Sequence, residues 1–242
     1  MSKVILHIPH SSLNIPQYLR NDILLSDSEI REELEVLTDL YTDLIFQGKD
    51  TIKSDFSRFV CDVERFEDDS SETMSKLGMG AVYLKTPTGK KLRHSDEEKR
   101  EHIMNTYYRP HHTKFEAMVQ DKLAKYDECI ILDCHSFNEN ITYVEMNDVD
   151  ICIGSDDYHT PTAITNKVTV IFKSFGYTVS INNPFSGSIV PLSYYNKDKR
   201  VKSIMLEVNK RVYTTNGIDI CEEGIERLTA ACNQVIDLLD IN

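Results

Sequence analysis

The sequence lacks a long apolar run, a secretory leader and an excess of basic charge, and each absence excludes a class of protein. No stretch approaches the roughly 18 consecutive apolar residues of a membrane span, so we expect no membrane partner. The start, Met-Ser-Lys before a short strand-like run, does not have a signal-peptide layout, which predicts a cytoplasmic protein. A net charge of −12 without a long basic stretch disfavours binding to nucleic acid.

Cysteine-pair motifs, a compact zinc-protease motif and internal repeats are also absent. The six cysteines form no CxxC pair, and several lie in apolar runs, as buried free thiols do. Without an HExxH motif, any metal site must be assembled from separate segments. With 242 residues, 40% of them hydrophobic, the chain can form one large core, and we expect one domain over residues 1–242.

The pattern of apolar residues predicts an α/β fold. Strands and helices alternate along the chain, which is typical of a mixed, mostly parallel central sheet flanked by helices. The predicted strands are residues 3–8, 58–63, 80–85, 128–134, 149–153, 177–182 and 201–208.

Helix signals lie between these strands. The capping box Ser26-Asp-Ser-Glu29 predicts a helix that continues to about residue 44, with one apolar stripe and one acidic face. The stripe is Ile30, Leu34, Leu37, Tyr41 and Leu44, and the acidic face is Glu35, Asp39 and Asp43. A second helix is predicted to open at Ser95-Asp-Glu-Glu98 and to kink or break near Pro110, and a last one spans about 219–239.

Two histidines follow apolar strand-like runs and point to a metal site. His10 comes after run 4–8, and His135 after run 129–132. Ligands of open α/β sheets bind at the carboxyl ends of the strands, where both histidines are expected. A catalytic zinc usually has three protein ligands from His, Asp and Glu, with a water in the fourth position. The third ligand is Asp39 or Asp43 of the acidic helix face, and we favour Asp39.

Each of these residues also has a purely structural interpretation. His10 can cap the His-Ser-Ser turn, and His135 can be a buried histidine bonded to backbone. His7, inside the first strand, is expected to be a core residue with its hydrogen bonds satisfied. Asp39, taken alone, is expected to be a solvated carboxylate on a helix. The case for a metal therefore rests on the combination.

Several short motifs that occur in order resemble the N-formylglutamate amidohydrolase family. They are His7-Ile-Pro-His10-Ser-Ser, Thr38-Asp-Leu-Tyr-Thr-Asp43, Ser57-Arg-Phe-Val-Cys-Asp-Val-Glu-Arg65, Tyr108-Arg-Pro-His-His112, Asp133-Cys-His-Ser-Phe137, Asn183-Pro-Phe-Ser-Gly187 and Glu207-Val-Asn-Lys-Arg-Val-Tyr213. The resemblance implies a zinc-dependent amidohydrolase whose fold is related to carboxypeptidases and cell-wall amidases. It also implies cleavage of the N-acyl amide of an acidic amino acid, such as N-formyl-L-glutamate to formate and glutamate.

The resemblance assigns roles to individual residues. His10, Asp39 and His135 would be the zinc ligands, and Glu207 would take a proton from water and return it to the departing nitrogen. Without the resemblance, Glu207 reads as a carboxylate paired with Arg211.

Substrate contacts are assigned in the same way. Arg58, Arg65 and Arg211 are the candidate clamps for a substrate carboxylate, because a guanidinium binds one bidentately. Structural salt bridges of Arg58 and Arg65 with Asp62 or Glu64 are the alternative.

Two further residues complete the candidate site. His112 is assigned a hydrogen bond to the substrate or to the tetrahedral intermediate, with helix packing as the alternative. Asn183 is expected to shape the mouth of the pocket.

Glu64 is the main departure from the family pattern, in which an asparagine is expected. A carboxylate near the proposed clamp opposes an anionic substrate unless another cation offsets it. Hydrolysis of another acyl-amino acid or of a peptidoglycan amide therefore stays an alternative, as does a non-catalytic binding protein. The sequence leaves the oligomeric state open.

Overall fold

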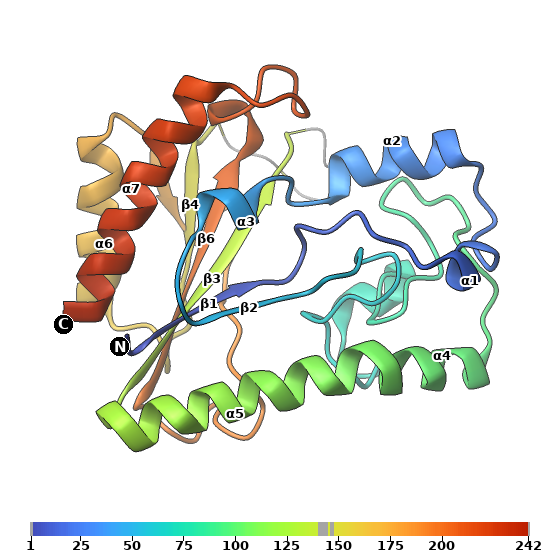
Figure 1. The fold of residues 1–242 in the computed structure, drawn as a ribbon, viewed down its shortest axis with the longest axis horizontal. Helices are drawn as coiled ribbons and strands as arrows, with labels where there is room; N and C mark the ends of the chain where they lie inside the picture. The colour runs from blue at the N-terminus through green and yellow to red at the C-terminus, as the bar shows by residue number, and fades with distance from the viewer. Residues whose placement is uncertain (1, 140–144, 146–147, 242) are drawn as a thin grey trace.

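The computed structural model describes residues 2–139, 145 and 148–241 and contains one six-stranded sheet (Figure 1). The strand order is β2-β1-β3-β6-β4-β5. Neighbouring strands are parallel except β4 and β6, which are antiparallel. The strands are β1 (Val4–Ile8), β2 (Thr51–Lys53), β3 (Cys129–Phe137), β4 (Ile151–Gly154), β5 (Val179–Ile181) and β6 (Val201–Asn209). The predicted fold class, a mixed and mostly parallel α/β sheet, is confirmed.

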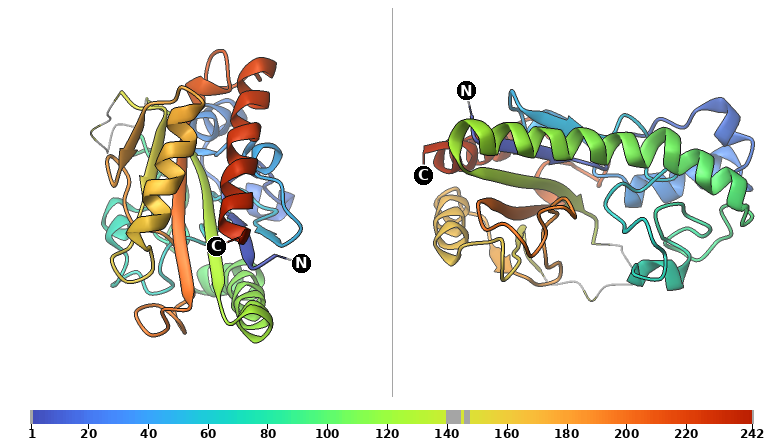
Figure 2. Two further views of the ribbon diagram at one scale, coloured as in Figure 1. Left: turned by 90° about the vertical axis from the view of Figure 1, so that its left-hand side faces the viewer. Right: turned by 90° about the horizontal axis from the view of Figure 1, so that it is seen from below.

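The helices are α1 (Gln17–Arg20), α2 (Asp27–Leu37), α3 (Thr42–Ile45), α4 (Glu97–Ile103), α5 (Arg109–Tyr126), α6 (Thr162–Ser174) and α7 (Glu222–Ile241). Some of them cover the two faces of the sheet, whereas α1, α2 and α4 lie beyond its edge (Figure 1). Helices α6 and α7 lie side by side on one face, and α5 crosses the other (Figures 1 and 2). Among the described residues, no helix is both long and apolar enough to span a membrane.

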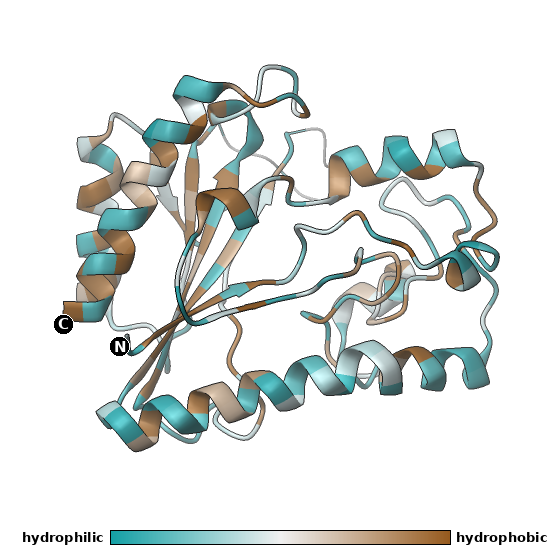
Figure 3. Ribbon diagram, in the orientation of Figure 1, coloured by the Kyte–Doolittle hydropathy of each residue, from teal (hydrophilic) through white to brown (hydrophobic). Residues whose placement is uncertain are grey.

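Alternation along the central strands separates a core face from a site face. Leu132 and Cys134 of β3 and Leu206 of β6 pack into the core formed with α6 and α7. Figure 3 shows the apolar residues concentrated along the strands, while much of α5 is polar. Because successive side chains point to opposite faces, His135 and Glu207 lie on the α5 side.

Two predicted strands are wrong. Residues 58–63 and 80–85 form turns and irregular backbone, and Val60, Val63 and Ala81 are buried in a cluster with Ile103. A short apolar run in a buried loop has the same sequence pattern as a strand, since both are buried. β2 was not predicted, because its three residues are too short to show a pattern.

Helix α2 ends earlier than predicted. Its capping box at Ser26 and Glu29 is confirmed, but the helix stops at Leu37. The buried Lys210 ammonium donates to the carbonyls of Glu35 and Val36. These carbonyls lie in the last turn of α2, where no backbone N–H of the helix can reach them.

The acidic residues assigned to that helix therefore do not share one face of it. Asp39 lies in the segment that follows α2, and Asp43 lies in the separate helix α3. Two residues of the predicted apolar stripe also fall outside α2, since Tyr41 precedes α3 with a φ of 66° and Leu44 is exposed in α3.

The second predicted helix begins one residue later and does not break. Its N-cap is Asp96, which accepts from the backbone N–H of Lys99, rather than Ser95. A π-helical turn, Met104–Tyr108, precedes Pro110. It joins α4 to α5, so that the two form one continuous helical segment (Figure 2). This rearrangement fits the missing N–H of Pro110 without ending the helix. The last helix, α7, is confirmed.

Candidate metal centre and active site

The fold brings together the three residues predicted as metal ligands. His10 follows β1. The backbone N–H of Asp39 donates to the carbonyl of His10 at 3.0 Å, and this hydrogen bond holds the segment after α2 against the end of β1. His135 lies in β3, the neighbour of β1. All three side chains are buried. One ligand atom from each lies within 4.8 Å of the other two, so the described residues include a group that could hold a metal ion.

The two imidazole rings present the same nitrogen to Asp39. Nδ1 of His135 is 2.9 Å from Oδ2 of Asp39, and Nδ1 of His10 is 3.6 Å from the same oxygen. Nδ1 of His10 is buried and has no hydrogen-bond partner among the described residues.

The opposite nitrogen of each ring is bound to a second carboxylate. Nε2 of His10 donates to Oδ1 of Asp62 at 2.8 Å, and Nε2 of His135 donates to Oδ1 of Asp133 at 3.0 Å. A histidine that holds a metal commonly donates its other N–H to a carboxylate, which fixes the tautomer and the ring orientation. In this tautomer both Nδ1 lone pairs face Asp39.

The carboxylates around the two histidines give this site an excess of negative charge. Burial alone would lower the pKa of His135, but the carboxylates of Glu64, Asp133 and Asp39 raise it well above its usual value. In the same way, burial opposes ionisation of Asp39, yet its contacts with His10 and His135 hold its pKa below the usual range.

This donor set fits a divalent cation. A proton on His135 and a metal ion compete for the same lone pair, and two neutral imidazoles with one carboxylate match the ligands that zinc takes. The unpartnered Nδ1 of His10 is the donor atom that such an ion would engage.

Glu207 lies beside this group. It pairs in register with His135 across the parallel strands β3 and β6, which are about 4.8 Å apart in such sheets. Its Oε2 is buried and has no hydrogen-bond partner in the described part of the chain. Burial, reinforced by the charges of Asp39, Glu64 and Asp133, raises its pKa to about 8.

A cavity of about 340 Å³ adjoins this group. Glu64 and Asp133, which contact His135, line it together with Arg65 and His112. The rest of its wall consists of the loop 186–192, Glu72 and the side chains of Phe66, Tyr108, Tyr195 and Met205. The cavity is therefore suited to a small molecule with both polar and apolar parts.

Comparison with known proteins identifies the family. Residues 2–214 match the family model of N-formylglutamate amidohydrolase. The chain belongs to this family of amidohydrolases. An N-formylglutamate deformylase of Pseudomonas putida is 18% identical over 216 residues, which cover 87% of this chain and 81% of that protein.

Solved structures show the same fold. The N-formylglutamate amidohydrolase of Ralstonia eutropha JMP134 superposes with a TM-score of 0.83 at 19% identity, covering 98% of this chain and 94% of the other. A gene product of Agrobacterium tumefaciens superposes with a TM-score of 0.69 at 18% identity, covering 98% and 89%.

In this family member, both arginines near the site are directed at Asp62. Nε and Nη2 of Arg58 donate to Oδ2 of Asp62 at 3.1 and 2.7 Å. Nε of Arg65 lies 3.5 Å from the same oxygen. The Tyr83 hydroxyl also donates to it at 2.7 Å. Arg58 thus forms the structural salt bridge with Asp62 that was the alternative to a substrate clamp. Arg65 also contacts Asp62, but it lines the cavity as well.

The remaining predicted residues are distributed differently. His112 lines the cavity and donates through Nε2 to the carbonyl of Val63 at 2.9 Å, and burial lowers its pKa to about 4, which keeps the ring neutral. Arg211 forms a surface cluster with acidic residues and does not pair with Glu207. Asn183 is exposed after β5 and is not part of the cavity wall, and Asp43 pairs with Lys53 at the surface.

His7 is buried, as expected for a core histidine. Its Nδ1 donates to Asp133 at 2.8 Å, its Nε2 is 3.1 Å from Nε2 of His111, and its ring stacks on Phe115. With Glu64 and Asp133 it forms a second group of metal-ligand type. The Asp133 oxygen in that group is already hydrogen-bonded to His7 and His135.

Sequence reasoning missed the roles of Asp62 and Asp133 as partners of the histidines. For Asp133 a signal was present, because residues two apart in a strand point to the same face, and Asp133 precedes His135 by two. Asp62 lies in irregular backbone that was predicted as strand, so its position relative to His10 had no signal in the sequence.

Proposed function

We propose that this protein is a zinc-dependent amidohydrolase that cleaves N-formyl-L-glutamate to formate and glutamate. The observation that carries the proposal is the convergence of His10, Asp39 and His135 beside Glu207, whose buried Oε2 has no hydrogen-bond partner among the described residues. Family membership supports the amide substrate.

The reaction needs an activated water, because water is a poor nucleophile and an amine is a poor leaving group. Bound zinc would polarise the formyl carbonyl and lower the pKa of water. Glu207 accepts a proton from the attacking water at its carboxylate and returns it to the departing nitrogen. Its raised pKa suits both roles, since such a carboxyl group holds and releases a proton near neutral pH.

The cavity lined by Glu64, Arg65 and Asp133 holds the amino-acid part of the substrate. Arg65 is the cation on its wall, and a guanidinium can bind a carboxylate bidentately. In the neutral ring of His112, Nε2–H donates to the carbonyl of Val63. Nδ1 therefore remains as an acceptor for the substrate amide N–H. Asp62 holds Arg65 in position, and Glu64 disfavours substrates with excess negative charge.

A pair of variants tests the ligand set. Asp39→Ala removes the carboxylate that both histidines face, so bound zinc and release of formate from N-formyl-L-glutamate should both be lost. Asp43→Ala removes a surface carboxylate four residues away and should retain both. Retention of stoichiometric zinc by Asp39→Ala, or no formate from the wild-type protein, would contradict the proposal.

A further inference from the structure

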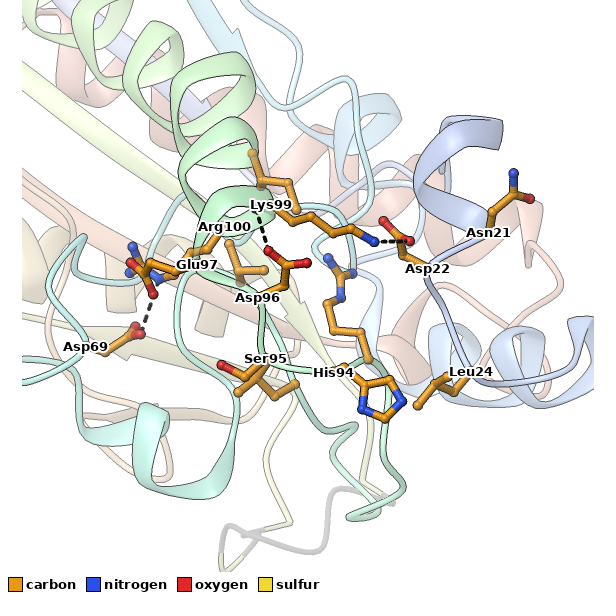
Figure 4. A pocket seen from close by; sticks show the side chains of 14 residues that line it. Asn21, Asp22, Leu24, Asp69, His94, Ser95, Asp96, Glu97, Lys99 and Arg100 are labelled. Atoms are coloured by element: carbon orange, nitrogen blue, oxygen red, sulfur yellow. Dashed lines mark hydrogen bonds and ion pairs between the residues drawn. The ribbon is translucent and has the colours of Figure 1, made fainter.

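A second cavity lies between the end of α1, the start of α4 and the segment 82–96 (Figure 4). Its volume is about 290 Å³, close to the lower limit of pockets that bind small molecules. It shares no lining residue with the cavity beside Glu207, so it is a separate site.

Arg93 lines this cavity and is buried, with 6% of its surface exposed. One of its terminal nitrogens donates to the carbonyl of Phe59, but its Nε has no hydrogen-bond partner among the residues that the structure describes. No carboxylate of the described residues forms an ion pair with it. A buried charged donor without an acceptor is destabilising, so an anion that reached this nitrogen would be favoured. Burial lowers the pKa of Arg93 to about 10, in spite of the charge of Asp22.

The other cations of the cavity are already paired. Lys99 contacts Asp22 at 2.6 Å, and Arg100 contacts Asp69 at 3.3 Å, as the dashed lines in Figure 4 show. The unpaired guanidinium among the residues lining the cavity is therefore Arg93.

The wall restricts the charge and shape of a ligand. Four carboxylates surround the cavity: Asp22, Asp69, Asp96 and Glu97. They disfavour a dianion such as phosphate, because like charges repel. Val82 and Ile103 provide buried apolar surface.

We propose that this cavity binds a small aliphatic monocarboxylate. The carboxylate accepts hydrogen bonds from the guanidinium of Arg93, and the hydrocarbon part lies against Val82 and Ile103. A guanidinium binds a carboxylate through directed N–H groups in a way that an ammonium does not, so Arg93 is specific for this role.

The test uses n-butyrate as the probe and butyramide as its uncharged analogue, with dissociation constants from NMR titration of the full chain. We expect butyrate to bind at least tenfold more tightly than butyramide or inorganic phosphate. The same titration of His135→Ala should give the same butyrate affinity, because the proposal does not depend on the metal centre. Equal affinities for butyrate and butyramide, tighter phosphate binding, or loss of binding in His135→Ala would overturn the proposal.

Variants locate the site. Arg93→Lys should weaken butyrate binding at least tenfold, whereas Arg200→Lys, at an exposed arginine that pairs with Asp198 outside the cavity, should leave it unchanged. Ser95→Phe fills the cavity from an exposed position without altering the bond between Arg93 and Phe59, and it should also abolish binding. If Arg93→Lys does not fold, Ser95→Phe decides, and unchanged butyrate affinity in either folded variant contradicts the site.

Discussion

At the scale of single residues, the chemistry depends on carboxylates in different environments. Asp62 is surrounded by cationic and hydroxyl donors, which keep it ionised. Glu207 has a buried oxygen to which no described residue donates, and burial favours its protonated form. The first environment suits a residue that positions a histidine, and the second suits one that exchanges protons.

Glu207→Gln tests the proton-transfer role. The amide keeps the size of the side chain but cannot accept a proton from water, so turnover of N-formyl-L-glutamate should fall about 10²- to 10⁴-fold. Zinc content, measured by atomic emission, should stay at the wild-type level, since Glu207 is outside the ligand group. A rate close to that of the wild type would assign proton transfer to another residue.

Asp133→Asn tests the support of His135. An amide can still accept the Nε2–H, but without the charge that orients the ring and increases its basicity, so zinc affinity should fall about 10- to 100-fold. Competition with a chromophoric chelator measures this change. Asp121→Asn, at an exposed carboxylate of α5, is the control. An unchanged zinc affinity in Asp133→Asn would show that His135 does not rely on this partner.

The residue-scale predictions from sequence succeeded where a strand dictates position. His10 and His135 were expected at the carboxyl ends of neighbouring strands, and the structure brings them together. The positions that differ from expectation concern side chains outside the strands. Arg211 was assigned to a substrate clamp and instead lies in a surface cluster with Glu139, Asp148 and Asp150, because neither its direction nor those partners follow from local pattern.

At the scale of elements, helix starts were more predictable than helix ends. The capping box of α2 is a local pattern and is confirmed, whereas its end depends on Lys210, which is 173 residues after Leu37 in the sequence and reaches the helix only in the folded chain. The early end matters for function, because it releases Asp39 from the helix and lets it reach His10.

Capping makes a quantitative prediction for two serines. Ser26→Ala removes the acceptor for the N–H of Glu29 and should reduce the free energy of unfolding by about 1 kcal/mol. Ser95→Ala should change it by less than about 0.5 kcal/mol, because Asp96 caps α4. Urea unfolding followed by circular dichroism measures both. Equal losses in the two variants would contradict the assignment of the caps.

At the scale of the whole molecule, buried charges connect stability to pH. Burial would raise the pKa of Asp62, but Arg58, His10 and Arg65 lower it well below its usual value. A carboxyl group whose folded-state pKa is depressed stabilises the folded protein above its unfolded pKa of about 4, and this contribution is lost as pH falls through the folded value.

Asp62→Asn should therefore weaken the dependence of stability on acid. In urea titrations between pH 5 and pH 3, the free energy of unfolding of the wild type should fall more steeply than that of Asp62→Asn. Asp43→Asn, at a surface carboxylate that pairs only with Lys53 among the described residues, should follow the wild type. Parallel curves for all three proteins would show that Asp62 is not part of this linkage.

The most direct test of the account is the release of formate and glutamate from N-formyl-L-glutamate by chelator-stripped protein, with and without added zinc. We predict negligible release from the stripped protein and recovery when zinc is added in stoichiometric amount. Full activity in protein shown to be free of metal would contradict the central claim that His10, Asp39 and His135 form a catalytic zinc site.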